Sequence, residues 1–319
     1  MKKLILVVVV VFFTINNYAQ TESHSIENSV AIDTFKVLSP DKLHSKVDQI
    51  VTTLLTRYHY KKIDLNDSLS SVIFDNYIKS LDYNRVYFIK SDINKFEKYR
   101  YLIDNYLLSG DLKVPYEIFN TYKERMNNSV KYVINEMKNE FDYSLNEDFI
   151  PRRDEAEWAS NQAELNDIWK KRLKNDALNK KLQKEDWEKT SETLVNRYKR
   201  FHKIILQYKE EDVFQLYMNA FASAIDPHTS YFSPITSENF NISMSLTFEG
   251  IGASLMAKDD YTTIARIIPG GPAAKSKDLF ENDRIVAVAQ GEDGEPVDII
   301  GWRLDDVIQL IRGKKGTLV

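Results

Sequence analysis

The stretch Phe248-Glu249-Gly250-Ile251-Gly252-Ala253 lies just beyond the point where the pattern of the sequence changes. Up to Ala224, apolar residues recur every three or four positions, as they do in amphipathic helices. After Asp226-Pro227 the sequence consists of short runs broken by glycine and proline. Two glycines separated by one residue let a backbone turn and let another chain approach closely. This pattern alone is weak evidence, because an ordinary hairpin turn would also show it.

The residues around this stretch predict a small β-rich domain over residues 236–319. Alternating or β-branched runs predict strands at residues 243–248, 253–257, 261–268 and 283–288, with a last strand beginning at residues 317–319. The sequence Pro269-Gly270-Gly271-Pro272 predicts a turn that leads into a short helix, and residues 304–311 return to helical spacing.

This order of elements is similar to that of PDZ domains, in which a guest peptide adds as a strand to an exposed sheet edge. The glycine loop would surround the guest's terminal carboxylate with backbone N–H groups. Leu304 and Ile308 lie four apart on one face of the late helix and fall where PDZ domains line the groove. The candidate peptide-binding residues are therefore Phe248, Glu249, Gly250, Ile251, Gly252, Ala253, Leu304 and Ile308.

The side chains expected around the terminal pocket, Ile251 and Ile308, predict a guest with an apolar C-terminus. Leu304 has an alternative interpretation, in which it belongs to the domain core. We assign the neighbouring Val307, Leu310 and Ile311 to that core.

Residues 36–235 predict an all-α domain, so the expected fold class is α+β. A helix is expected to open at Ser39-Pro40-Asp41, because Ser39 is a suitable N-cap and proline favours the first helical position. Its predicted inner face consists of Leu43, Val47, Ile50, Val51 and Leu54. Further helices are expected around residues 69–78, from 91 to the stop at Gly110, from Pro115 to 137, and around 158–173, 194–205 and 214–221.

The first residues are typical of a secretory signal peptide at residues 1–19. Met1-Lys2-Lys3 precedes an apolar run over residues 4–13, and Ala19 is the expected cleavage site. Residues 20–35 would form a disordered linker. The sequence therefore predicts an exported protein of the periplasm or cell envelope of a Gram-negative-type bacterium, with no stable membrane anchor after cleavage. An uncleaved membrane anchor is the alternative interpretation.

Composition narrows the possible chemistry. The 319 residues contain no cysteine and have a net charge of −4, which excludes thiolate chemistry and disfavours a nucleic-acid partner. The five histidines form no close pair, so no metal site is expected, and no cofactor either. Asp226, His228 and Ser230 are the residue types of a catalytic triad, but neighbours on one short loop cannot adopt its geometry. We interpret them as parts of a structural turn.

Four runs together resemble the tail-specific (C-terminal processing) proteases of bacterial envelopes. The runs are residues 81–88 (LDYNRVYF), 226–234 (DPHTSYFSP), 248–253 (FEGIGA) and 301–306 (GWRLDD). The resemblance implies a helical N-terminal domain, a PDZ domain that captures substrate C-termini, and a protease domain with a serine nucleophile and a lysine base. We expect that serine and lysine to lie beyond Val319, so no catalytic residue is assigned in this chain.

The leading prediction is thus the substrate-recognition part of a periplasmic tail-specific serine peptidase. Its expected partners are flexible or unfolded protein C-termini, with a possible adaptor protein. Two alternatives stay open at this stage. One is a non-catalytic PDZ protein of the cell envelope that binds peptides, and the other is a structural helical protein with a vestigial PDZ domain.

Overall fold

The computed structural model describes residues 36–245, 250–313 and 316–319. The predicted signal peptide (1–19) and linker (20–35) lie outside these residues, as do Phe248 and Glu249 of the glycine loop. Expectations about them stay predictions.

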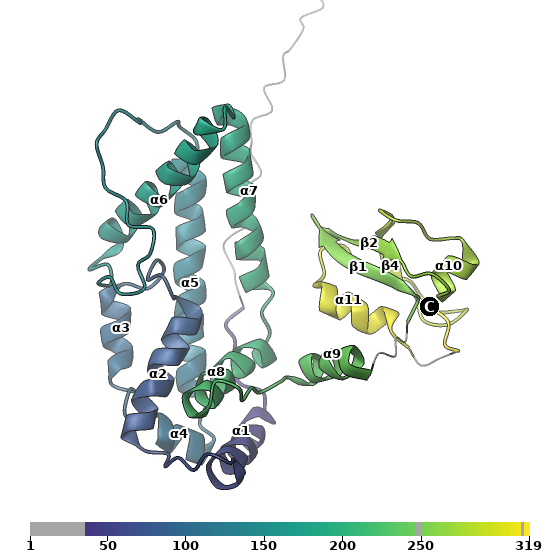
Figure 1. Ribbon diagram of the computed structural model, residues 1–319, viewed down its shortest axis with the longest axis horizontal. Coiled ribbons are helices and arrows are strands. Elements are labelled where there is room, and N and C mark those ends of the chain that lie inside the picture. The colour runs from purple at the N-terminus through teal and green to yellow at the C-terminus, as the bar shows by residue number, and fades with distance from the viewer. Residues whose placement is uncertain (1–35, 246–249, 314–315) are drawn as a thin grey trace, which may run out of the picture. The chain divides into compact units, whose positions relative to one another are not determined.

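The first part of the described chain is helical, as the apolar spacing predicts (Figure 1). The elements are α1 (His44–Thr53), the π-helix η1 (Leu54–Tyr58), α2 (Asp67–Leu81), α3 (Lys90–Glu97), α4 (Ile103–Ser109), α5 (Lys113–Glu136), α6 (Gln162–Leu182), α7 (Trp187–Leu206), α8 (Glu210–Ile225) and α9 (Pro234–Ser245). Helices α5, α6 and α7 run side by side, and α2 packs against α4 and α8. Among the described residues, no helix is both long and apolar enough to cross a bilayer.

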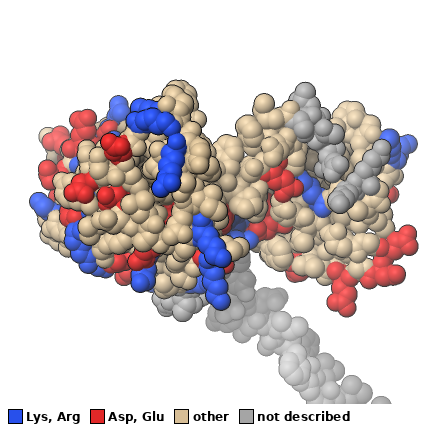
Figure 2. Space-filling model, turned by 90° about the horizontal axis from the view of Figure 1, so that it is seen from below, with Lys and Arg blue, Asp and Glu red and all other residues tan. Residues whose placement is uncertain are grey.

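Two apolar clusters hold these helices together. The first joins α2, α5 and α8 through fully buried side chains such as Phe74, Phe119 and Phe221. The second lies among α5, α6 and α7 and includes Trp169 and Leu194. Many aromatic residues of the helical part therefore serve packing, while others, such as Tyr60 and Phe201, are exposed. Acidic and basic side chains are interspersed over the face of this part that Figure 2 shows.

The predicted inner face of the first helix is largely wrong. Leu43, Ile50 and Leu54 are 65%, 59% and 52% exposed, and the helix begins at His44 rather than after Ser39. Its buried face instead carries the polar residues His44, Asp48 and Thr52, and of these His44 has partners that are distant in the sequence. The His44 ring stacks on Phe214 at 4.5 Å between centroids, and its Nε2 lies 2.9 Å from a Glu211 carboxylate oxygen.

The helix expected from residue 91 to Gly110 is two helices, α3 and α4. The Asp104 N–H donates to the Ser70 hydroxyl at 2.9 Å, so a side chain of α2 satisfies a backbone donor at the start of α4. Gly110 ends α4 with φ +72°, as predicted for a left-handed C-terminal stop.

The second part of the chain contains short antiparallel strands. The elements are β1 (Ala253–Lys258), β2 (Tyr261–Ile267), α10 (Pro272–Ser276), β3 (Arg284–Ile285), β4 (Ala287–Val288), β5 (Val297–Asp298) and α11 (Leu304–Ile311). One sheet has the order β1-β2-β3, and β4 pairs with β5 in a second sheet. The strand expected over residues 283–288 is thus divided between two sheets. Val307 and Ile311 are buried in the core of this domain, which confirms their assignment, and Leu310 packs against it.

Helix α9 was not predicted, and the structure differs from the prediction at two expected strands. Residues 243–245, expected to begin a strand, belong to α9, and residues 246–249 lie outside the described part. Ser233 and Pro234 have the pattern of a helix start, an N-cap residue followed by proline at the first helical position. The Ser233 hydroxyl accepts from the Thr236 N–H at 3.3 Å. Residues 317–319 form no strand, and are joined to the domain by the Gly291 N–H, which donates to the Leu318 carbonyl at 2.9 Å.

Candidate peptide-binding site

The glycine loop is fixed by the turn that follows β2. Gly252 has φ +77°, and a Cβ atom there would lie 2.9 Å from the Gly271 Cα. Only glycine fits this close approach of two backbones without displacement. The carbonyls of Ile251 and Gly252 accept from the N–H groups of Ala273 and Ile268, at 2.8 and 2.9 Å. Both carbonyls therefore point toward the turn.

The same bonds orient the amide donors of the loop. In a trans peptide group the N–H points away from the C=O, and the described residues contain no cis peptide bond. The N–H groups of Gly252 and Ala253 thus point to the side opposite the turn. Strand β1, which begins at Ala253, lies at the edge of its sheet and has a register irregularity between Ser254 and Leu255. An edge strand of this kind can accept a further strand.

A cavity of about 350 Å³ adjoins the loop. Residues 250–253 line it on one side, and Ile308 of α11 lines it on the other. The structure therefore brings together Gly250, Ile251, Gly252, Ala253 and Ile308 of the predicted site. Leu304, one turn earlier on α11, is half-buried and does not line this cavity.

Eight further lining residues were not predicted as site residues: Ile242, Ser254, Leu255, Ile268, Gly271, Pro272, Ile311 and Arg312. Ile268 and Ile311 were assigned to a strand and to the core, and each also contributes to the cavity wall. Arg312 follows the end of α11, and its guanidinium donates to the Asn239 side chain of α9 at 2.9 Å. Within the described ranges no carboxylate lies at ion-pair distance from Arg312. Its positive charge is thus not neutralised by this part of the chain.

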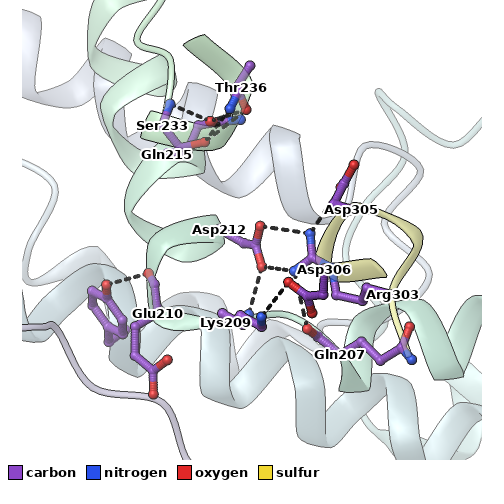
Figure 3. A network of polar contacts seen from close by, with 11 residues as sticks. Gln207, Lys209, Glu210, Asp212, Gln215, Ser233, Thr236, Arg303, Asp305 and Asp306 are labelled. Atoms are coloured by element: carbon purple, nitrogen blue, oxygen red, sulfur yellow. Dashed lines mark hydrogen bonds and ion pairs between the residues drawn. The ribbon is translucent and has the colours of Figure 1, made fainter. Parts of the chain in front are cut away.

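The first turn of α11 is bonded to the beginning of α8 (Figure 3). The Arg303 guanidinium pairs with the Asp212 carboxylate, and Lys209 Nζ lies 2.6 Å from Asp306 Oδ1. The Gln207 side chain donates to the Gly301 carbonyl at 2.8 Å. Several polar contacts therefore join α11, which forms one wall of the cavity, to the helical part of the chain.

The run over residues 81–88 has a structural role. The buried Asp82 carboxylate accepts from the N–H groups of Val86, Tyr87 and Phe88 at 2.8, 2.8 and 2.9 Å. Burial raises the pKa of Asp82, and the three backbone donors oppose part of that rise. The Trp169 indole N–H in turn donates to the Val86 carbonyl at 2.7 Å. This loop is a backbone anchor between α2 and α6.

The run over residues 226–234 contains no triad geometry. His228 Nδ1 lies 3.4 Å from Asp226 Oδ1, but its side chain is 90% exposed. Asp226 instead receives the Tyr60 hydroxyl at 3.1 Å, and its carbonyl accepts from the Thr229 N–H at 3.0 Å. These contacts form a structural turn. Across the ranges that the structure covers, no three candidate ligands gather in a group that could hold a metal ion.

Fold and cavity together define a helical protein that carries a PDZ domain. The family model of the tail-specific protease N-terminal domain matches residues 50–235, and the PDZ domain model matches residues 240–319. The chain belongs to the tail-specific protease family.

Similar proteins from other bacteria support this assignment. A tail-specific protease of Haemophilus influenzae is 40% identical over 269 residues, which are 84% of this chain and 39% of that protein. The carboxy-terminal processing protease CtpA of Bacillus subtilis is 36% identical over 94 residues, 30% of this chain and 19% of that one. This chain thus spans about two-fifths of the length of the Haemophilus protein.

A solved structure is also similar in sequence. It is the PDZ domain of a carboxy-terminal protease from Vibrio cholerae in complex with a peptide, 59% identical to this chain. The match covers 22% of this chain and 69% of that one, with a TM-score of 0.21.

Proposed function

We propose that this chain is the substrate-recognition part of a tail-specific serine peptidase and binds the apolar C-termini of protein substrates. The observation that carries the proposal is the cavity between the glycine loop and Ile308, beside β1, which lies at the edge of its sheet among the described strands. It offers backbone donors at one end and apolar side chains along its wall, which matches the chemistry of a C-terminal residue.

The charges around the cavity suit a terminal carboxylate. The N–H groups of Gly252 and Ala253 point away from the turn and can donate to an anion. Arg312 adds a positive charge that the described residues leave unneutralised. A guest lying along β1 would place its carboxylate at the loop and its last side chain against Ile308.

Capture of a tail would serve proteolysis through proximity. A bound C-terminus has a high local concentration at a protease domain tethered to the same chain, so binding increases the rate of cleavage. The proposed location is the periplasm or cell envelope, since residues 1–19 have the pattern of a secretory signal peptide.

Fluorescence anisotropy with labelled decapeptides tests the proposal. We expect saturable binding of a peptide that ends in leucine, and at least roughly tenfold weaker binding when its carboxylate is amidated or its last residue is lysine. Ile308→Asp should abolish binding, because it places a carboxylate in the apolar wall. The matched control is Ile300→Asp, since Ile300 is 44% exposed in the same domain and does not line the cavity. Equal binding of the free and amidated peptides would refute recognition of a C-terminus.

A further inference from the structure

The cavity has a wall that comes from outside the strands and helices of the PDZ domain. Ile242 of α9 lines it together with the loop residues 250–253 and Ile308. Helix α9 belongs in sequence to the end of the helical part, before the glycine loop. A residue of the preceding helix is therefore in a position to contact what the cavity holds.

Helix α9 is held against α11 and the residue after it by side-chain hydrogen bonds. The Gln309 amide donates to Glu238 at 3.1 Å, and the Arg312 guanidinium donates to Asn239 at 2.9 Å. Residues three and four apart share one face of a helix, so Ile242 lies on the same face as Asn239 and Glu238. The contacts that join the two helices thus also direct Ile242 toward the cavity beside Ile308.

The start of α9 is fixed on α8. The Ser233 N–H and the Thr236 hydroxyl both donate to the Gln215 side chain, at 2.8 and 3.0 Å (Figure 3). Phe240 packs against Phe232 with ring centroids 5.3 Å apart. The position of α9 is therefore set by α8 at its beginning and by α11 and Arg312 near its middle.

From this geometry we propose that Ile242 is a specificity-determining residue, which contacts the last side chain of the bound C-terminus and limits its size. This inference rests on the proposed function, because it assumes that the carboxylate binds at the glycine loop. A carboxylate there places the last side chain in the same cavity, whose apolar walls include Ile242, Ile268 and Ile308. The volume of residue 242 then sets the room for that side chain.

Peptides that differ only in the last residue test the proposal on the full chain. Ile242→Ala should shift the ratio of the Kd values for alanine-ended and phenylalanine-ended peptides roughly tenfold in favour of phenylalanine, the usual size of such pocket effects. Ile242→Phe should shift the ratio the other way. Ile242→Val should act in the direction of Ile242→Ala with a smaller effect, and serves if the larger replacements disturb folding.

Met244 provides the matched control. It lies on the same helix, is 67% exposed and does not line the cavity, so Met244→Ala and Met244→Phe should leave the ratio unchanged. The role of Ile242 would be overturned if the ratio of Kd values stayed the same in all variants of residue 242. The proposed function would stand in that case if Ile308→Asp still abolished binding. Absence of binding to the unaltered chain would overturn both.

Discussion

A buried carboxyl group in α1 predicts an unusual dependence of stability on pH. Asp48 is fully buried, and neither of its carboxylate oxygens accepts a well-formed hydrogen bond from the described residues. Burial raises its pKa from 3.8 to about 8, and the Thr52 hydroxyl one turn later opposes only part of that rise. The folded protein therefore holds a proton on Asp48 at neutral pH, when the unfolded chain has released it.

The size of the effect follows from this difference in pKa. Between pH 4 and pH 8 the folded state binds one proton more than the unfolded state, so each unit of rising pH lowers the free energy of unfolding by up to about 1.4 kcal/mol. From pH 5 to pH 7 the loss is thus roughly 2–3 kcal/mol. The penalty is absent below the unfolded pKa and complete above the folded one. Asp48→Asn keeps the shape of the neutral carboxyl and removes the titration.

Urea unfolding followed by far-UV circular dichroism at pH 5, 6 and 7 measures the effect. We expect the stability of Asp48→Asn relative to the unaltered chain to increase by about 1.4 kcal/mol per pH unit. The control is Asp64→Asn, because Asp64 is exposed in the loop before α2 and should show no such trend. Parallel stability curves for Asp48→Asn and the unaltered chain would refute the argument that Asp48 is protonated in the fold.

Three further substitutions test other parts of the structure. Asp82→Ala leaves three backbone N–H groups without their acceptor and should lower the free energy of unfolding by about 3 kcal/mol or more in urea titrations, whereas a loss below about 1 kcal/mol would contradict the anchor role. Gly252→Ala introduces a Cβ 2.9 Å from the Gly271 Cα and should weaken leucine-ended peptides at least roughly tenfold in anisotropy titrations, so unchanged affinity would count against the loop geometry. Arg303→Ala removes the contact with Asp212 and should speed amide hydrogen exchange in α11 by about fivefold, equivalent to about 1 kcal/mol, and unchanged exchange would show that the contact contributes nothing.

Local patterns predicted most of the elements because their causes are local. Residues 304–311 were expected as a helix and form one with the same bounds, since apolar spacing and burial agree there. The first helix shows where the reasoning fails. Its apolar residues include the exposed Ile50, while its buried face depends on Glu211 and Phe214, far away in the sequence. Spacing identifies an amphipathic helix but does not identify which face meets its partners.

Some residues of the candidate site could likewise be predicted from the sequence, and others could not. Glycines with a defined spacing and an apolar residue on a late helix are visible in the sequence, so the loop and Ile308 could be predicted. Ile242 could not, because its place in the cavity wall depends on how α9 packs against α11. The Ser233-Pro234 pair indicates the helix itself, but no local pattern indicates that one of its side chains lines a groove with the glycine loop and with the distant α11.

The α11 region contacts both the cavity and the helical part of the chain. The residue before its first turn, Arg303, is bonded to Asp212 of α8, and the residue after its last turn, Arg312, is bonded to Asn239 of α9. Its central residue Ile308 meanwhile lines the cavity. Any shift of α11 on binding therefore lengthens or shortens contacts at both ends. If a bound peptide strengthens those contacts by some factor, then a change that forms the contacts must increase the affinity for the peptide by the same factor.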